Sequence, residues 1–359
     1  MSAVYQKLRE FLDQFPLGFP ASPSGLEIEI LKRLFTPEEA EIAVLLTPIP
    51  EEAAPIAARA GRSADEMAVK LADMAQKGLI FRVDRGGLDR YSSAPFMIGI
   101  YEYSVKRIDR ELAELYKRYY DEAYQDEMGV SDVPGFKVIP LKKNIEAGLT
   151  LLPYEKLEDD VRAARVIAVT DCICRKEAQL TGHGCHHPLE ACLSFGVAAE
   201  YYIRNGSGRR INADEALEIL RIADASGLVH AGANSKHLSN ICNCCPCCCA
   251  SMKGMVQKGH PTRKYMNPIF EAVIDQAECT ACGTCVERCP VKAITVDDVA
   301  AVDRERCLGC GLCAGECPVE AIALRRREDA AEPFERVLDM SLAILEAKKI
   351  KRAAGRDRG

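Results

Sequence analysis

Eighteen cysteines carry most of the chemistry that this 359-residue sequence can offer. All of them lie between Cys172 and Cys317, so the first half of the chain and its last forty or so residues contain none. Clustered thiols behind an N-terminus with no secretory signal are typical of metal ligands in a reducing compartment, where disulfides do not persist. The sequence therefore predicts a cytoplasmic, metal-binding protein.

The C-terminal thiols have the most regular spacing. A run of the form C-x-x-C-x-x-C-x-x-x-C-P occurs twice, and every position of the second run follows the first at a constant offset of 28 residues. The first run comprises Cys279, Cys282, Cys285 and Cys289, and the second comprises Cys307, Cys310, Cys313 and Cys317. A repeat held in register in this way indicates an internal duplication.

Three cysteines spaced three residues apart can surround one face of an iron–sulfur cubane. The fourth cysteine of each run lies past a helical turn, too far from that cubane, and reaches a second cluster. The pattern resembles the bacterial-type two-[4Fe-4S] ferredoxin over about residues 270–326 and matches it at all eight ligand positions. The resemblance implies two [4Fe-4S] clusters. One is held by Cys279, Cys282, Cys285 and Cys317, and the other by Cys289, Cys307, Cys310 and Cys313.

Ten further thiols form two groups in the middle of the chain, and we predict that they are metal ligands too. They are Cys172, Cys174, Cys185 and Cys192, followed by Cys242, Cys244, Cys245, Cys247, Cys248 and Cys249. The strongest candidates are Cys172, Cys174, Cys242 and Cys245. The expected cofactor is at least one further Fe–S cluster, with zinc as the alternative because His186 and His187 adjoin Cys185. Redox-active or free thiols are the third interpretation.

Arg175 follows the first of these thiols closely and has two interpretations. Its guanidinium could balance the negative charge of a thiolate-ligated cluster, or it could form a surface salt bridge.

The N-terminal residues 20–100 are predicted to form several short helices followed by a hairpin. Thr36-Pro37-Glu38-Glu39 and the pair Ser63 and Glu66 are helix-start signals, and strands are expected at 79–83 and 89–94. This order resembles a winged helix-turn-helix domain. The helix at 64–77, which would read DNA, carries three acids, so we favour protein docking over DNA binding.

The remaining elements lead to the cysteines. We expect an amphipathic helix at 104–126, whose tyrosines pack in a core or an interface, and a connector at 127–160. A strand at 165–171 should deliver the chain to Cys172, helices at 190–203 and 214–225 should separate the two central cysteine groups, and a second strand should occupy 226–232.

The predicted fold class is α+β and multidomain. It comprises a winged-helix-like domain at 1–100, a helix and connector at 101–160 and a central α/β cysteine-rich domain at 161–265. A ferredoxin-like dicluster domain at 266–326 follows, and then a C-terminal helix with a solvated basic tail at 327–359.

No nucleotide-binding or hydrolase motif accompanies the thiols, and the net charge is −6. The favoured function is a multi-cluster electron-transfer protein or subunit that relays low-potential electrons to or from a partner oxidoreductase, with flavin or metal in the partner. The whole chain resembles multi-cluster 4Fe-4S proteins of anaerobes. The alternatives are an Fe–S enzyme with a substrate-binding open iron and a redox-sensing DNA-binding regulator. We expect no membrane span, no DNA and a docking or homodimer-forming role for the helices.

Overall fold

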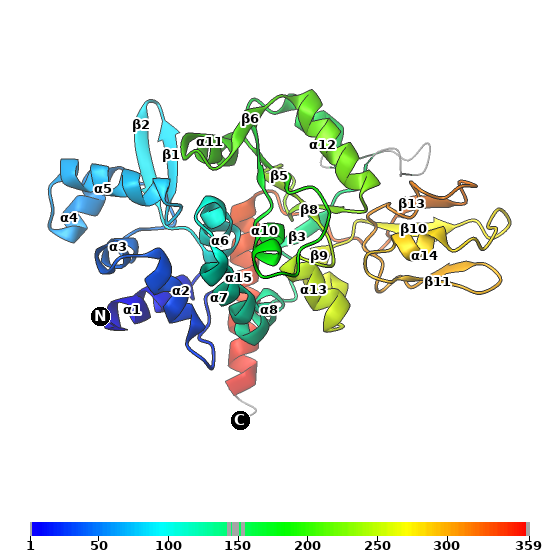
Figure 1. Cartoon of the computed structure of the whole chain (residues 1–359), viewed down its shortest axis with the longest axis horizontal. Helices are drawn as coiled ribbons and strands as arrows, with labels where there is room; N and C mark the ends of the chain where they lie inside the picture. Colours follow the sequence, from blue (N-terminus) through cyan, green and yellow to red (C-terminus); the bar gives the residue numbers. More distant parts are fainter. Residues whose placement is uncertain (1, 142–144, 146–150, 152–154, 357–359) are drawn as a thin grey trace.

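The computed structural model describes residues 2–141, 145, 151 and 155–356. Figure 1 shows three regions along the longest axis of the molecule. Short helices and a hairpin from the N-terminus lie at one end, a sheet with its helices lies in the middle, and the C-terminal cysteine repeat lies at the other end. The central thiols are therefore flanked by both of the other regions.

The N-terminal region contains the helices and the hairpin that the sequence predicts. Its elements are α1 (Ser2–Leu12), α2 (Leu26–Leu34), α3 (Pro37–Ala43), α4 (Ala53–Ala60), α5 (Ala64–Gln76), β1 (Phe81–Arg85) and β2 (Leu88–Ser92). Thr36 and Glu39 form the reciprocal hydrogen bonds of a capping box, and Ser63 accepts a hydrogen bond from the Glu66 amide. The local signals are confirmed, whereas the winged-helix assignment stays a prediction.

The helix predicted at 104–126 begins later than expected. The observed elements are α6 (Tyr101–Tyr103), α7 (Arg110–Tyr119) and α8 (Gln125–Met128), with short 3-10 and π turns between them. Helix α7 starts at Arg110 because the Asp109 side chain accepts a hydrogen bond from the Leu112 amide and caps it. The tyrosines of this segment pack in the core, as predicted: Tyr116, Tyr119 and Tyr124 are fully buried.

A seven-stranded sheet in the order β6-β4-β5-β8-β7-β3-β9 forms the middle of the molecule. Its strands are β3 (Phe136–Val138), β4 (Ile167–Asp171), β5 (Glu190–Phe195), β6 (Arg209–Ile211), β7 (Val229–Ala233), β8 (Asn240–Cys244) and β9 (Met266–Asn267). All neighbouring pairs are antiparallel except β3 with β9. The predicted α/β character of this region is therefore wrong, because parallel strands joined by crossover helices do not build the sheet.

The helices around this sheet are α9 (Leu157–Ala163), α10 (Ile173–Leu180), α11 (Gly196–Arg204), α12 (Ala213–Ala225) and α13 (Ala250–Gln257). The predicted strands at 165–171 and 226–232 correspond to β4 and β7, and Asn212 caps α12 as expected. The helix predicted at 190–203 is wrong in its first half. Residues of β5 lie between two strands of the sheet and are buried on both faces, which overrides the helical pattern.

The sheet also takes strands from segments that the sequence assigned elsewhere. Strand β3 lies in the expected connector, and β9 lies at the start of the expected ferredoxin domain. Each of these strands is too short to show a periodic pattern, so pairing with neighbours far along the chain determines them. The domain boundaries remain predictions.

The C-terminal module repeats its backbone as well as its cysteines. It contains β10 (Phe270–Ile274), α14 (Thr284–Arg288), β11 (Ile294–Val296), β12 (Ala300–Val302) and β13 (Ile322–Arg326), with β10 paired to β13 and β11 to β12. Positive φ angles recur at the same 28-residue offset: Ala281 with Gly309, Gly283 with Gly311, and Lys292 with Glu320. The duplication therefore extends to individual backbone conformations.

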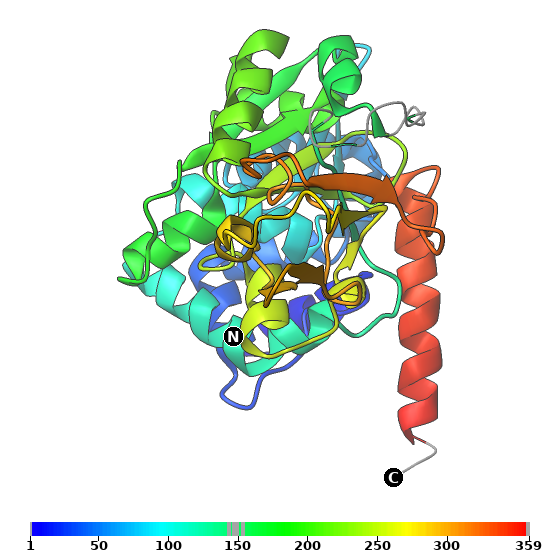
Figure 2. The same ribbon diagram turned by 90° about the vertical axis from the view of Figure 1, so that its right-hand side faces the viewer.

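The basic C-terminal segment is not the frayed end that the sequence predicts. Helix α15 (Val337–Arg356) continues through it, and Figure 2 shows this helix running along one side of the molecule. Lys348 is buried and forms an ion pair with Glu127, and Lys351 pairs with Asp132. These contacts fix the helix against α8 and the segment that follows it. Within the described ranges, no helix combines the length and the apolar character needed to cross a membrane.

Candidate metal centres

Two small cavities in the C-terminal module are each lined by four cysteines. Cys279, Cys282, Cys285 and Cys317 line the first, which we call the outer cavity. Cys289, Cys307, Cys310 and Cys313 line the second, which we call the inner cavity. Each has a volume of about 20 Å³. The fold thus brings together the two crossed sets that the ferredoxin resemblance implies, and both donor sets suit [4Fe-4S] clusters.

The two cavities differ in their exposure to solvent. Cys282 of the outer cavity is exposed, whereas Cys307 and Cys313 of the inner cavity are each only 8% exposed. Burial raises the pKa of Cys313 to about 12 and that of Cys310 well above its ordinary value. Coordination at the inner cavity must therefore release protons that the thiols hold at neutral pH.

Backbone amides of the neighbouring strands point at cysteine sulfurs in both cavities. The Ala293 amide lies 3.1 Å from the Cys289 Sγ, and the Ala300 amide lies 3.5 Å from the Cys279 Sγ. Donors at these positions stabilise negative charge on sulfur, which is one of the ways in which a protein sets the potential of an iron–sulfur cluster.

The ten central thiols separate into two groups in space. The first, which we call the quartet, consists of Cys185, Cys245, Cys247 and Cys248, whose Sγ atoms all lie within 4.8 Å of one another. Three of the sulfur–sulfur distances are 3.5, 3.9 and 4.0 Å. A tetrahedral ion with metal–sulfur bonds of about 2.3 Å places its thiolates about 3.8 Å apart. The quartet therefore has the sulfur–sulfur spacing of a single-ion site. To bind a cubane, its four thiols would have to move farther apart.

Neither His186 nor His187 belongs to the quartet. No ring nitrogen joins the four thiols within 4.8 Å, and no other set of three or more metal-binding side chains is this compact in the described part of the chain. The histidines that suggested zinc in the sequence therefore lend no support to it in the fold.

The other six central thiols line one cavity, and we call them the thiol ring. They are Cys172, Cys174, Cys192, Cys242, Cys244 and Cys249, and none of them belongs to the quartet. The cavity has a volume of about 60 Å³, and Cys245 and Cys248 of the quartet also contribute to its lining.

Several elements converge to build this ring. Cys172 follows β4 and directly precedes α10, Cys192 lies on β5, Cys242 and Cys244 lie on β8, and Cys249 directly precedes α13. The set that sequence reasoning ranked first is divided, because Cys245 belongs to the quartet and its three companions belong to the ring.

Arg175 lies between the two groups and lines the ring cavity. Its residue is 1% exposed, so the surface salt-bridge interpretation is wrong. Nη1 donates a 2.9 Å hydrogen bond to the Asn243 carbonyl oxygen and lies 4.0 Å from the Cys245 Sγ. Burial alone would lower the pKa of Arg175, but the Cys172 and Cys245 thiolates outweigh it and raise this pKa. The guanidinium therefore stays charged beside the thiols.

Glu102 is a residue of the ring cavity that sequence reasoning missed. It lies seventy residues before Cys172 in a short helix, and no spacing links it to the cysteines. Its Oε2 accepts a 2.8 Å hydrogen bond from the Gly99 amide, and burial raises its pKa to about 8. His230, by contrast, is a buried structural histidine whose Nδ1 lies 2.5 Å from the Asn243 Oδ1.

The comparisons with known proteins agree with this geometry at one end of the chain. Neither the curated proteins nor the solved structures gave a match to this sequence. The family model for the 4Fe-4S dicluster domain matches residues 272–324, which include the eight repeated cysteines and both of their cavities. The C-terminal module is therefore a ferredoxin-like 4Fe-4S dicluster domain, attached to a central region whose thiols also suit iron–sulfur clusters.

Proposed function

We propose that this protein is an electron-transfer component that connects a redox partner at its dicluster end with the thiol centres of its central region. When bound, the iron–sulfur clusters supply one-electron chemistry. The observation that carries the proposal is the arrangement of the cysteine sites along the molecule. Cys282 is exposed at the outer cavity, Cys307 and Cys313 of the inner cavity are buried, and the thiol ring lies in the central region.

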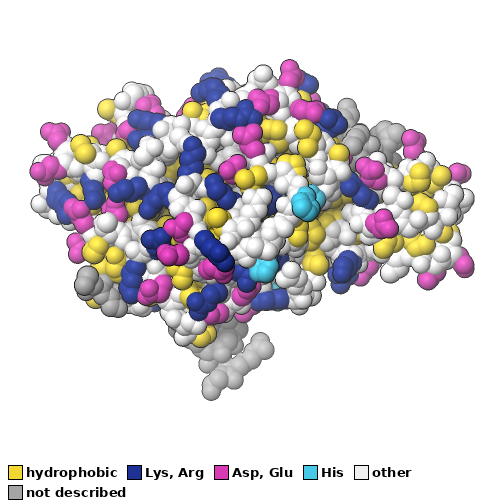
Figure 3. All heavy atoms as spheres, in the orientation of Figure 1, with side chains coloured by type: hydrophobic (Ala, Val, Ile, Leu, Met, Phe, Trp, Pro, Cys, Tyr) yellow, Lys and Arg dark blue, Asp and Glu magenta, His cyan; other side chains and the backbone are white. Residues whose placement is uncertain are grey.

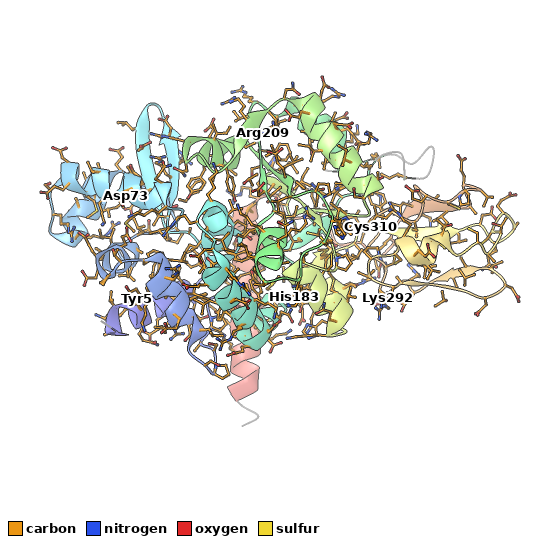
Figure 4. The ribbon with its side chains drawn as sticks, viewed as in Figure 1. Tyr5, Asp73, His183, Arg209, Lys292 and Cys310 are labelled. Carbon is orange, nitrogen blue, oxygen red and sulfur yellow. The ribbon has the colours of Figure 1, made fainter. Side chains whose placement is uncertain are left out.

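The chain between the dicluster module and the thiol ring is short. Met266 lines the ring cavity and Ala272 lines the inner cavity, so only five residues lie between the two linings. Even a fully extended chain of this length spans only about 20 Å. A single hydrophobic core also includes Cys244 of the ring together with Cys307 and Cys313 of the inner cavity. Figure 4 places Cys310 toward the central region. Continuous packing over a short distance supports electron transfer between these sites.

The outer end of the module offers a surface for a protein partner. Val286 and Val319 adjoin the cysteines of the outer cavity and are 38% and 39% exposed. In Figure 3 hydrophobic side chains gather on this end of the molecule, with acidic side chains around them. An apolar patch with a charged rim is a common form of docking surface.

Anaerobic reduction by a protein donor tests this proposal. Reduced flavodoxin is too large to enter the core, so it should reach the central centre only by way of the dicluster end. We expect Cys310→Ser to slow reduction of the central cluster, measured by freeze-quench EPR, well below the wild-type rate. Cys247→Ser, at the quartet, serves as the control and should leave the outer cluster's reduction unchanged. A wild-type rate in Cys310→Ser contradicts the proposal.

One observation favours the second candidate, an iron–sulfur enzyme. A cavity of about 340 Å³ adjoins the quartet and is lined by Cys247, Cys248, Lys117 and Lys253, a size that suits a small substrate. If only three thiols of the quartet hold a cubane and one iron stays open, mild oxidation with ferricyanide should release that iron and give the EPR signal of a [3Fe-4S] cluster. Recovery of zinc from the quartet would exclude this candidate.

The regulator alternative receives less support from the N-terminal region. The two lysines that could contact phosphates, Lys70 in α5 and Lys77 directly after it, are paired with acids: Lys70 with Glu38, and Lys77 with Glu39 and Asp73. Lysines engaged in this way cannot neutralise DNA phosphates without breaking their ion pairs. We therefore propose a protein-docking role for these helices.

A further inference from the structure

We propose that the thiol ring is a separate centre from the quartet, and that it holds an iron–sulfur cluster larger than one cubane, with all six ring cysteines as ligands. The inference concerns the nature of the cofactor and does not depend on the direction or the partner of electron transfer.

The first argument is the arrangement of the ligands. The four quartet sulfurs are all mutually close, whereas no three ring sulfurs meet the same 4.8 Å limit, although all six ring residues line one cavity. Thiols that line one cavity without converging on a point surround a space rather than a single ion. One [4Fe-4S] cubane uses four cysteines, so the ring has two more than a cubane needs.

The second argument is size, for which the same molecule supplies the reference. The inner and outer cavities are each lined by one complete cubane ligand set and measure about 20 Å³. The ring cavity measures about 60 Å³, and two quartet residues, Cys245 and Cys248, share its lining. A site with three times the free volume and six thiols outside the quartet has both the room and the ligands for more irons than a cubane contains.

The third argument is charge. Arg175 is buried against the ring cavity, and its Nε and Nη2 have no hydrogen-bond partner among the residues that the structure describes. Buried donors without partners are costly, so an occupant that accepts hydrogen bonds should satisfy them. Sulfide and thiolate sulfurs of an anionic cluster can accept these hydrogen bonds, whereas an apolar occupant cannot.

The segment at the end of β8 contributes to both groups. Cys242 and Cys244 are two residues apart on this strand and line the ring cavity, and Cys245, the residue after the strand, borders that cavity and also belongs to the quartet. One short segment therefore supplies cysteines to both groups.

The test counts metal in a full-length variant that lacks the quartet. Cys185→Ser combined with Cys247→Ser removes two quartet ligands, both outside the ring. After anaerobic purification, iron, zinc and acid-labile sulfide are counted per chain. The dicluster domain accounts for about eight irons, so a ring cluster larger than a cubane predicts a total above about twelve. Each of the six ring Cys→Ser changes in this background should then lower the count and alter the Mössbauer spectrum.

Three outcomes would overturn the inference. They are a total of about twelve irons with two ring cysteines replaceable without iron loss, a total of about eight, or zinc in place of iron. The EPR signal of the dicluster domain shows whether each ring variant is still folded. If Cys172→Ser and Cys192→Ser both abolish that signal, the milder Cys→Ala variants and the Mössbauer spectrum of the parent decide the question. A failed relay experiment would leave all of these counts unchanged.

Discussion

Arg175 joins the two central thiol groups, because its Nη1 lies 4.0 Å from the Cys245 Sγ and the same residue lines the ring cavity. A buried cation at this position favours the more negative, reduced state of an adjacent cluster. Arg175→Gln should therefore shift the midpoint potential of the central cluster negatively by roughly 50–150 mV, since unit charges about 4 Å apart interact by a few kcal/mol in a partly buried site.

An EPR-monitored redox titration measures this shift. Arg175→Lys keeps the charge and should show a smaller shift, and Arg162→Gln, which breaks a surface pair with Asp214, should show none. An unchanged potential in Arg175→Gln, with the cluster retained, would refute the electrostatic role.

Two glycines of the dicluster domain form a matched pair for a second prediction. Gly283 has φ +81° with no heavy atom within 4 Å of an added Cβ, whereas a Cβ on Gly309 would lie 2.0 Å from the Phe270 carbonyl oxygen. Gly283→Ala should cost about 1–2 kcal/mol from its left-handed backbone alone. Gly309→Ala adds a collision with the backbone. The temperature at which the domain loses its visible absorbance should therefore fall clearly further in Gly309→Ala than in Gly283→Ala. Equal losses in the two variants would show that the contact with β10 does not matter.

Glu177 predicts a pH dependence of stability. Its carboxylate accepts a 2.6 Å hydrogen bond from Tyr101, and burial raises its pKa to about 7 from an ordinary value of 4.5. Between these values the folded state holds a proton that the unfolded state has released, so the free energy of unfolding falls as the pH rises from 4.5 to 7. The loss attributable to Glu177 is on the order of 3 kcal/mol.

Thermal unfolding of Glu177→Gln at several pH values checks this dependence. In Glu177→Gln the free energy of unfolding should no longer fall between pH 4.5 and 7. In Glu41→Gln, at an exposed position, it should fall as in the wild type. A wild-type pH profile in Glu177→Gln would mean that the carboxyl titrates normally.

Lys348 anchors the C-terminal helix through a buried charge pair. The Lys348 ammonium contacts the Glu127 carboxylate, which also accepts a 2.7 Å hydrogen bond from the Gly18 amide, and both side chains are nearly inaccessible. Lys348→Ala leaves the Glu127 charge buried without this cation and should destabilise the protein by about 3–5 kcal/mol. The neighbouring Lys349→Ala, at an exposed position, should be close to neutral in the same urea-unfolding measurement. Similar effects of the two changes would argue against an anchoring role for the pair.

Much of the local structure could be predicted because its causes are local. The capping residues Thr36, Ser63, and Asn212 satisfy amides within three residues, so short sequence patterns identify the helices that they start. Strand β5 and the short β3 and β9 were missed because pairing with distant strands decides them. Burial of Lys348 likewise depends on an acid more than two hundred residues away.

The sequence by itself determined the dicluster site, since a repeated spacing of three residues fixes which cysteines share a cavity and which one crosses to the other. Only the tertiary structure decided how the ten central thiols divide. Cys185 and Cys245 are sixty residues apart and meet because the sheet brings their segments together. Cys244 and Cys245 are adjacent in the sequence, yet only Cys245 has its sulfur within the compact quartet, because positions in space rather than along the chain decide which thiols converge.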